Sequence, residues 1–167
     1  MNKVKSITKI KEEIALQKKK GKKTALITGC FDIIHIGHLK LFEYAKKNAD
    51  VLVVGIENDK SVSSSKGKGR PIFNQKDRAE MLSRLTSVDY VFINETLVEF
   101  GSLHADDAYE RIVKTIGPDF IVTTSEADKY WKNKANRARK MGTGFLANKT
   151  KRNISSTKIA KLLLEEQ

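Results

Sequence analysis

The segment from residue 24 to 46 constrains the fold of this chain more than any other. It reads as an apolar strand, a tight turn at residues 29–32, and a helix whose start carries His35, Gly37 and His38. Two histidines three residues apart at a helix start lie on one side of it, near backbone N–H groups that lack a partner within the helix. Those groups and the helix dipole favour an anion, and Gly37 lets a phosphate approach the backbone closely. Because an imidazole can donate a hydrogen bond to a phosphate oxygen, the segment predicts a phosphate site.

The order of elements around this segment predicts a parallel sheet. Residues 51–56 form a nearly unbroken apolar run, which is typical of a strand buried on both faces. Strand, helix and strand in this order favour an α/β fold with a Rossmann-like, doubly wound parallel sheet. We expect five strands, at residues 24–28, 51–56, 88–93, 120–122 and 144–147. We expect helices at residues 38–47, 74–85, 105–116, 126–141 (or a loop followed by a helix there) and 155–164.

The N-terminal residues 2–20 read as an amphipathic, lysine-rich helix. Val4, Ile7, Ile10 and Ile14 recur at helical spacing. We expect this helix to pack on the domain or on a second subunit, with an acidic membrane surface as the alternative. The chain is therefore divided into a basic helix and hinge at residues 1–23 and a single domain at residues 24–167.

Residues 60–70 predict a mobile polar loop. Three serines are followed by Lys66, Lys68 and Arg70, which are separated by glycines. The segment leaves the carboxyl end of the second strand, at the same edge as the histidines. Its cations are therefore placed to close over bound phosphates.

Charge and composition narrow the class of partner. The 32 basic and 20 acidic residues give a net charge of +12, which favours anionic partners such as nucleotides and phosphorylated metabolites. The lysines are spread along the whole chain, and a lysine-rich solvated surface needs no partner at all. We do not expect nucleic acid as the partner. Cys30 is the only cysteine, which excludes an internal disulfide and a cysteine-based zinc site. No apolar run approaches the roughly 20 residues of a membrane helix, and we expect a cytoplasmic protein that makes no membrane contact.

The turn Gly29-Cys30-Phe31-Asp32, two apolar residues and His35-Ile36-Gly37-His38 together resemble the signature of the cytidylyltransferase-like nucleotidyltransferases. The surroundings are similar to the adenylyltransferase part of ADP-heptose synthase and to glycerol-3-phosphate cytidylyltransferase. The resemblance extends over residues 24–93 and returns at residues 154–159. It implies an adenylyl- or cytidylyltransferase that moves a nucleoside monophosphate from ATP or CTP to a small sugar phosphate or alditol phosphate and releases pyrophosphate.

The resemblance also implies residue roles. Catalytic roles fall to His35, His38, Arg78 and a lysine of the 60–70 loop, Lys66 or Lys68. The nucleotide is expected to contact the turn, the first helix and the closing segment (Thr28, Gly29, Cys30, Phe31, Asp32, Gly37, Lys40, Ile154, Ser155, Ser156 and Thr157). The acceptor is expected at Thr123, Thr124 and Ser125, where the sequence departs from both relatives. Mg²⁺ is expected with the triphosphate, without assigned protein ligands, and the chain is expected to form a homodimer.

Two alternatives remain open. Beside the expected sugar phosphate or alditol phosphate enzyme, one alternative is an FMN or phosphopantetheine adenylyltransferase. The other is a non-catalytic nucleotide- or RNA-binding protein that retains the fold. A second departure from the family lies at Thr150, where an arginine is expected. Tyr130 and Trp131 are expected to pack against the core, with stacking on a base or closure of a substrate pocket as the alternatives.

Overall fold

Five parallel strands form the centre of the computed structural model, which describes residues 2–149 and 154–165. Their order across the sheet is β3-β2-β1-β4-β5. The bounds of the strands are β1 (Thr24–Gly29), β2 (Val51–Glu57), β3 (Tyr90–Asn94), β4 (Phe120–Thr124) and β5 (Gly144–Asn148). The described residues thus confirm the predicted α/β class and its Rossmann-like, doubly wound sheet.

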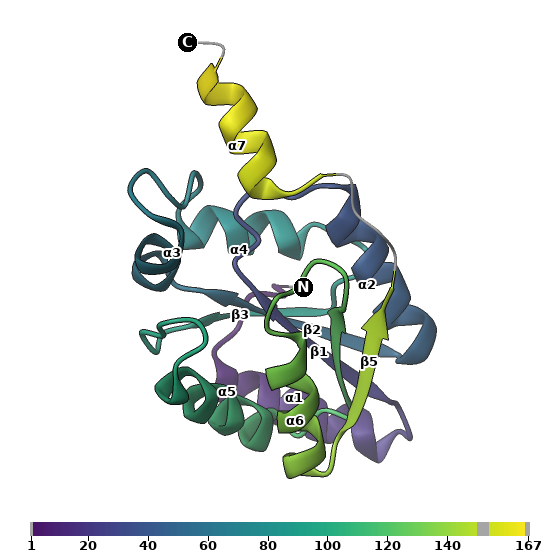
Figure 1. The fold of residues 1–167 in the computed structure, drawn as a ribbon. Helices are drawn as coiled ribbons and strands as arrows, with labels where there is room; N and C mark the ends of the chain where they lie inside the picture. Colours follow the sequence, from purple (N-terminus) through teal and green to yellow (C-terminus); the bar gives the residue numbers. More distant parts are fainter. Residues whose placement is uncertain (1, 150–153, 166–167) are drawn as a thin grey trace.

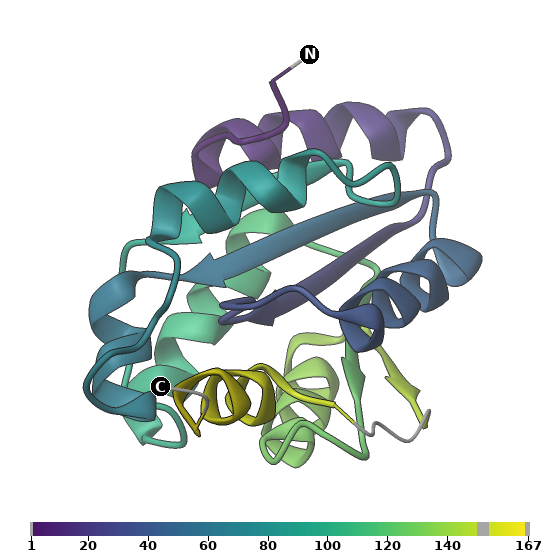
Figure 2. The same cartoon turned by 90° about the horizontal axis from the view of Figure 1, so that it is seen from above.

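Helices cover both faces of this sheet (Figure 1). The described helices are α1 (Ile7–Lys19), α2 (Ile36–Asn48), α3 (Asp59–Lys66), α4 (Gln75–Ser83), α5 (Leu103–Ile116), α6 (Trp131–Met141) and α7 (Ser156–Glu165). One face carries α2 and α4, and the other carries α1, α5 and α6. Figure 2 shows α1 and α5 side by side on the second face, whereas α7 projects from the body of the molecule in Figure 1.

Alternation along β1 explains why the core has two halves. Ala25 and Ile27 belong to the apolar cluster under α2 and α4, while Leu26 belongs to the cluster under α1, α5 and α6. All three side chains are buried, as a strand enclosed on both faces requires. The apolar run at β2 follows the same rule, since every one of its residues is buried.

The N-terminal segment corrects the expected helix at residues 2–20. The helix begins at Ile7, after Ser6 caps it. Residues before it are extended: Val4 forms a parallel bridge with Val91, and the N–H of Lys5 donates to the Val91 carbonyl at 2.9 Å. β3 is the last strand at its side of the sheet, and this short segment satisfies backbone groups that an edge strand leaves unpaired.

Most of the segment at residues 60–70 is also different from the loop that we expected, and only residues 67–70 lie outside a helix or strand. Residues 59–66 form the helix α3, capped by the Asn58 side chain, which accepts from the Ser61 N–H. Ser61 and Val62 are completely buried, and the Ser61 hydroxyl accepts from the Val98 N–H at 2.9 Å. Serine-rich sequence favours loops locally, but these tertiary contacts stabilise a helix.

The other elements lie close to their expected positions. Asn74 caps α4 by accepting from two backbone N–H groups, as predicted. Of the two readings of residues 126–141, a loop followed by a helix is correct, because α6 begins at Trp131. No helix in the described ranges is both long enough and apolar enough to cross a membrane.

Candidate functional site

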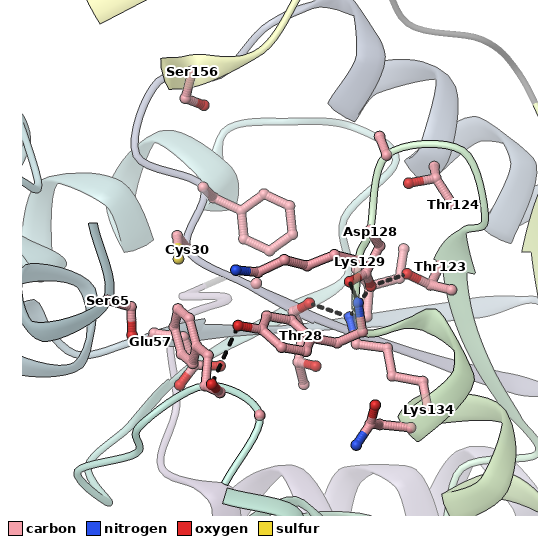
Figure 3. A pocket seen from close by; sticks show the side chains of 18 of the residues that line it. Thr28, Cys30, Glu57, Ser65, Thr123, Thr124, Asp128, Lys129, Lys134 and Ser156 are labelled. Carbon is pink, nitrogen blue, oxygen red and sulfur yellow. Dashed lines mark hydrogen bonds and ion pairs between the residues drawn. The ribbon is translucent and has the colours of Figure 1, made fainter. Parts of the chain in front are cut away.

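A pocket of about 660 Å³ lies at the carboxyl edge of the sheet, where β1 and β4 are neighbours. The chain runs outward from this point in both directions, to β2 and β3 on one side and to β5 on the other. Such a switch point leaves a crevice in open α/β sheets. Figure 3 shows Cys30 and Glu57 on one side of the pocket, and Thr124, Asp128 and Lys134 on the other.

The turn after β1 brings both histidines to the pocket. Phe31 has a φ of 48°, in the left-handed region that few side chains adopt. Its buried ring packs edge-on against His38, with ring centroids 5.1 Å apart, and lies against Phe42. This packing holds the tight turn that leads from β1 directly to the start of α2.

His35 and His38 cap the start of α2 reciprocally. His35 Nδ1 accepts from the Gly37 N–H at 3.2 Å, and His38 Nδ1 accepts from the His35 N–H at 3.4 Å. The two rings stack with centroids 3.8 Å apart. Because each Nδ1 accepts a hydrogen bond, each neutral ring carries its proton on Nε2. The pair thus lines the pocket with ring N–H donors at the positive end of a helix dipole, which suits a bound anion.

A second helix start and a lysine extend this anion-binding surface. Ser155, Ser156 and Thr157 line the pocket where α7 begins. The Ser156 hydroxyl donates to the Ile33 carbonyl at 2.9 Å, which joins the start of α7 to the turn that precedes α2. Lys66 lines the pocket from the last residue of α3.

The β4 side of the pocket carries an ion pair. Lys134 on α6 lies 2.7 Å from Asp128 and donates to the Thr28 carbonyl at 3.1 Å. The Thr123 hydroxyl donates to the same carboxylate at 2.5 Å. Burial opposes ionisation of Asp128, but the Lys134 ammonium and these hydrogen bonds hold the pKa of Asp128 below its ordinary value. The pair therefore ties α6 to the ends of β1 and β4.

The β2 side carries a buried carboxyl group. Glu57 is 1% exposed, and its two oxygens accept from the Tyr109 hydroxyl at 2.8 Å and the Asn94 amide at 3.0 Å. Burial raises the pKa of Glu57, and burial beside that carboxyl also raises the pKa of Tyr109. Burial likewise raises the pKa of the Cys30 thiol to about 11, so this thiol stays protonated at neutral pH.

The structure brings most of the predicted site residues together at the pocket. Those that line it are Thr28, Gly29, Cys30, Phe31, His35, His38, Lys66, Thr123, Thr124, Ser155, Ser156 and Thr157. Of the two candidate lysines of residues 60–70, Lys66 rather than Lys68 faces the pocket. Tyr130 also lines it, and its hydroxyl donates to the Phe100 carbonyl at 3.2 Å, so this aromatic residue helps to close one end.

The structure places Arg78 outside the pocket wall. Its side chain is completely buried and donates to the carbonyls of Cys30 at 2.5 Å, Glu57 at 2.8 Å and Phe73 at 3.0 Å. It also pairs with Asp59 at 2.7 Å. Arg78 thus holds the turn after β1 against the carboxyl end of β2 and the start of α3. These contacts explain why a cation lies in the first turn of α4, where the helix dipole disfavours positive charge.

Asp32 is a second predicted site residue that the fold uses internally. It is fully buried, pairs with Arg70, and accepts from the Ile72 N–H at 2.7 Å. Asp32 therefore fastens the segment before α4 to the turn. The remaining predicted residues that do not line the pocket are Gly37, Lys40, Ser125 and Ile154. Thr150 lies outside the described residues.

Several lining residues were not found from the sequence. Glu57, Tyr109, Asp128, Lys134 and Arg137 all line the pocket, the last with its guanidinium 2.5 Å from Asp106. Lys134 and Arg137 are three residues apart on α6 and so share a helix face. That spacing was the available signal, but it does not say which face of a basic helix points inward.

Solved structures share this fold. A lipopolysaccharide core biosynthesis protein from Thermoplasma volcanium is 25% identical, with a TM-score of 0.59 over 79% of this chain and 100% of that one. Pantothenate synthetase from Thermus thermophilus aligns with a TM-score of 0.69 over 95% of this chain and 67% of that one, at 13% identity. The second likeness concerns the fold alone.

Curated relatives share more of the sequence. Bifunctional protein HldE from Citrifermentans bemidjiense is 34% identical over 121 residues, covering 72% of this chain and 23% of the relative. HldE from Aliarcobacter butzleri is 41% identical over 119 residues, covering 71% and 23%. The chain thus spans less than a quarter of the length of these relatives. Their similarity confirms the resemblance to ADP-heptose synthase.

The family model described as cytidylyltransferase-like matches residues 26–162. This range contains the five strands, the histidine pair at the start of α2 and the closing segment at the start of α7. The match covers most of the chain, so the chain belongs to the cytidylyltransferase-like family and is a nucleotidyltransferase.

Proposed function

We propose that this nucleotidyltransferase moves a nucleoside monophosphate from ATP or CTP to a small phosphorylated acceptor, a sugar phosphate or an alditol phosphate. The observation that carries the proposal is the histidine pair at the start of α2. The Nδ1 atoms of these histidines accept hydrogen bonds from backbone N–H groups, and their rings line the pocket. The resemblance to ADP-heptose synthase and the name of a similar structure, a lipopolysaccharide core biosynthesis protein, agree with a phosphorylated sugar as acceptor.

In the proposed reaction, a phosphate oxygen of the acceptor attacks the α-phosphorus of the triphosphate. A new P–O bond forms, the bond to the bridging oxygen breaks, and pyrophosphate leaves with the electron pair. The attacking oxygen is already anionic, so the protein's task is to align two anions and offset the charge on the phosphates. The N–H donors of His35 and His38, the starts of α2 and α7, and Lys66 suit that task.

Mg²⁺ is proposed as the companion of the triphosphate, held mainly by phosphate oxygens and water. When bound, it neutralises phosphate charge. In residues 2–149 and 154–165 no group of three His, Cys, Asp or Glu side chains is placed to hold a metal. The acceptor is proposed to lie near Thr123 and Thr124, which line the β4 side, with Ser125 just beyond them. A homodimer also remains a proposal, which the molar mass in solution tests.

The test is pyrophosphate release with ATP or CTP against sugar 1-phosphates, glycerol 3-phosphate, FMN and phosphopantetheine. We expect release with one nucleotide and one sugar or alditol phosphate. His35→Ala should lower the rate by about 10²–10³-fold, because it removes a preorganised donor. His104→Ala is the matched control, since His104 is exposed on α5 and does not line the pocket.

The other outcomes separate the alternatives. Release with FMN or phosphopantetheine identifies a different adenylyltransferase. Nucleotide binding without release from any pair contradicts a sugar or alditol phosphate acceptor. RNA binding that falls steeply with salt and ignores Mg²⁺, without any release, identifies a binding protein instead.

A further inference from the structure

The acidic side chains that line the pocket differ in their partners. Asp106 lies 2.5 Å from Arg137, and Asp128 lies 2.7 Å from Lys134. Glu57 is more deeply buried than either, yet within the described residues no Lys, Arg or His nitrogen lies within 4.0 Å of its carboxylate. Its hydrogen-bond donors are the neutral groups of Tyr109 and Asn94. Among the residues that the structure describes, Glu57 is therefore a lining carboxyl group without an ion-pair partner.

This arrangement leaves acceptor capacity on Glu57. Each carboxylate oxygen receives one hydrogen bond from the described part of the chain, and each can accept another. A buried carboxylate is costly unless its hydrogen bonds are made, and burial raises the pKa of Glu57 in agreement with that cost. A donor on a bound ligand would supply the missing hydrogen bond.

The charge of the pocket decides which donor fits. Of the residues that the structure describes, the basic side chains that line it are Lys66, Arg70, Lys129, Lys134 and Arg137, against three acidic ones, Glu57, Asp106 and Asp128. This excess of positive charge opposes a cationic amine and accepts a neutral hydroxyl group. A hydroxyl also donates to a carboxylate without bringing a charge into the site.

Glu57 lines the same pocket as His35 and His38. Gly29 at the end of β1 is paired with Ile56, and Glu57 follows directly at the end of β2. The turn that leads to His35 starts at the next residue after Gly29. Glu57 thus lies across the same pocket from Thr123 and Thr124, near which the acceptor is proposed to lie (Figure 3).

We propose that Glu57 accepts a hydrogen bond from a hydroxyl group of the acceptor and so selects polyhydroxylated phosphate esters over plain alkyl phosphates. This proposal rests on the proposed function and identifies a residue that recognises the acceptor. Glu57 is a specificity-determining residue, separate from the phosphate-binding histidines.

The experiment measures binding by calorimetry with three probes of similar size: glycerol 3-phosphate, propyl phosphate and phosphoethanolamine. Glycerol 3-phosphate carries two hydroxyl groups and phosphoethanolamine carries an ammonium group. The carbon chain of propyl phosphate carries no hydrogen-bond donor. We expect glycerol 3-phosphate to bind the wild-type protein about tenfold more tightly than propyl phosphate, which is the size of one hydrogen bond to a charged group. Glu57→Gln should remove most of that preference and leave the affinity for propyl phosphate unchanged.

Asn94→Ala is the matched control. Asn94 donates to Glu57 but does not line the pocket, so its loss disturbs the same buried network without removing the carboxylate. It should lower the melting temperature and retain the preference for glycerol 3-phosphate. Equal loss of preference in both variants would show that Glu57 acts only through packing, and would overturn the proposal.

Other results overturn it as well. These are no difference between glycerol 3-phosphate and propyl phosphate in the wild-type protein, tighter binding of phosphoethanolamine, and an unchanged preference in Glu57→Gln. Because binding is measured without turnover, the proposed function is tested separately by pyrophosphate release. If the wild-type protein releases pyrophosphate but Glu57→Gln keeps the preference for glycerol 3-phosphate, only the role of Glu57 is refuted. If Glu57→Gln loses that preference but the wild-type protein releases no pyrophosphate, only the reaction is refuted.

Discussion

At the scale of single residues, polar side chains around the pocket have two different roles: some line the pocket, and others bind the protein's own backbone. His35 and His38 use Nδ1 to cap α2, and both residues line the pocket. Arg78 and Asp32 instead direct their polar atoms to the protein's own backbone. Residue type alone does not distinguish these two roles, because an arginine can donate hydrogen bonds to a phosphate or to a set of backbone carbonyls.

Arg78→Lys tests the structural role of this arginine. A lysine cannot reach three carbonyls and a carboxylate together, so buried acceptors lose their donors. We expect unfolding free energy to fall by about 3–5 kcal/mol in urea denaturation. Arg84→Lys on the exposed end of the same helix should change it by less than about 0.5 kcal/mol. A normal stability combined with a raised KM for the nucleotide would favour phosphate binding by Arg78 instead.

The Asp128–Lys134 pair predicts an acid-dependent loss of stability. Since the pKa of Asp128 is lowered in the folded protein, its contribution is complete above the unfolded value near 3.8 and is lost as the pH falls through the folded pKa. Asp128→Asn should destabilise the protein by about 1–3 kcal/mol at pH 7, and the difference from wild type should shrink at acid pH. Chemical denaturation at several pH values measures it.

Asp107→Asn provides the comparison for that series. Asp107 is exposed on α5 and lies outside the pocket wall. Its variant should follow the wild-type curve at every pH. A difference between Asp128→Asn and wild type that stays constant down to the lowest pH would contradict the linkage.

At the scale of elements, tertiary packing decides where helices begin. The segment around Val4 is extended and bridges to Val91 of β3, although the spacing of Val4 continues the apolar pattern of α1. α3 formed from a serine-rich segment because Ser61 and Val62 are enclosed by the surrounding chain. Local propensity differs by less than about 1 kcal/mol per residue, so such contacts override it.

The packing of α1 predicts a large effect from its buried residues. Ile10 and Ile14 are 0% and 1% exposed in the apolar cluster with α5 and the sheet. Ile10→Ala should lower the unfolding free energy by about 2–5 kcal/mol, because it leaves a cavity. Leu16→Ala on the same helix, where the side chain is 53% exposed, should cost less than about 1 kcal/mol. Similar values for both variants in urea denaturation would contradict this packing.

At the scale of the whole molecule, a net charge of +12 surrounds a pocket whose lining is also positive. Such a field attracts polyanions and makes their binding sensitive to salt. Charge by itself does not separate a nucleotide from RNA. The pocket at the switch point of the sheet, with its donors at two helix starts, is what favours a compact triphosphate.

Removal of Mg²⁺ is the corresponding prediction. We expect EDTA to abolish pyrophosphate release, because the triphosphate charge is no longer neutralised, and added Mg²⁺ to restore it. The melting temperature without nucleotide should stay unchanged, since the metal is proposed to arrive with the triphosphate. A fall in that melting temperature would point to a metal held by the protein itself.

The sequence by itself determined the sheet, the strand–turn–helix unit and the family. Each depends on short-range signals: the apolar runs of β1 and β2, and the spacing of His35 and His38 after a tight turn. Phe31, Ser156 and Lys66 were predicted to lie near the histidines because the sequence resembles the family at these positions, and all three line the pocket.

The tertiary structure alone decided which polar side chains reach the pocket. Glu57, Tyr109 and Lys134 come from three different elements, and their contacts join residues far apart in the chain. Arg78 and Asp32 were directed inward by the same long-range contacts. Local sequence specifies the direction of a strand or a helix face, but the partner of a buried charge is fixed only when distant elements pack together.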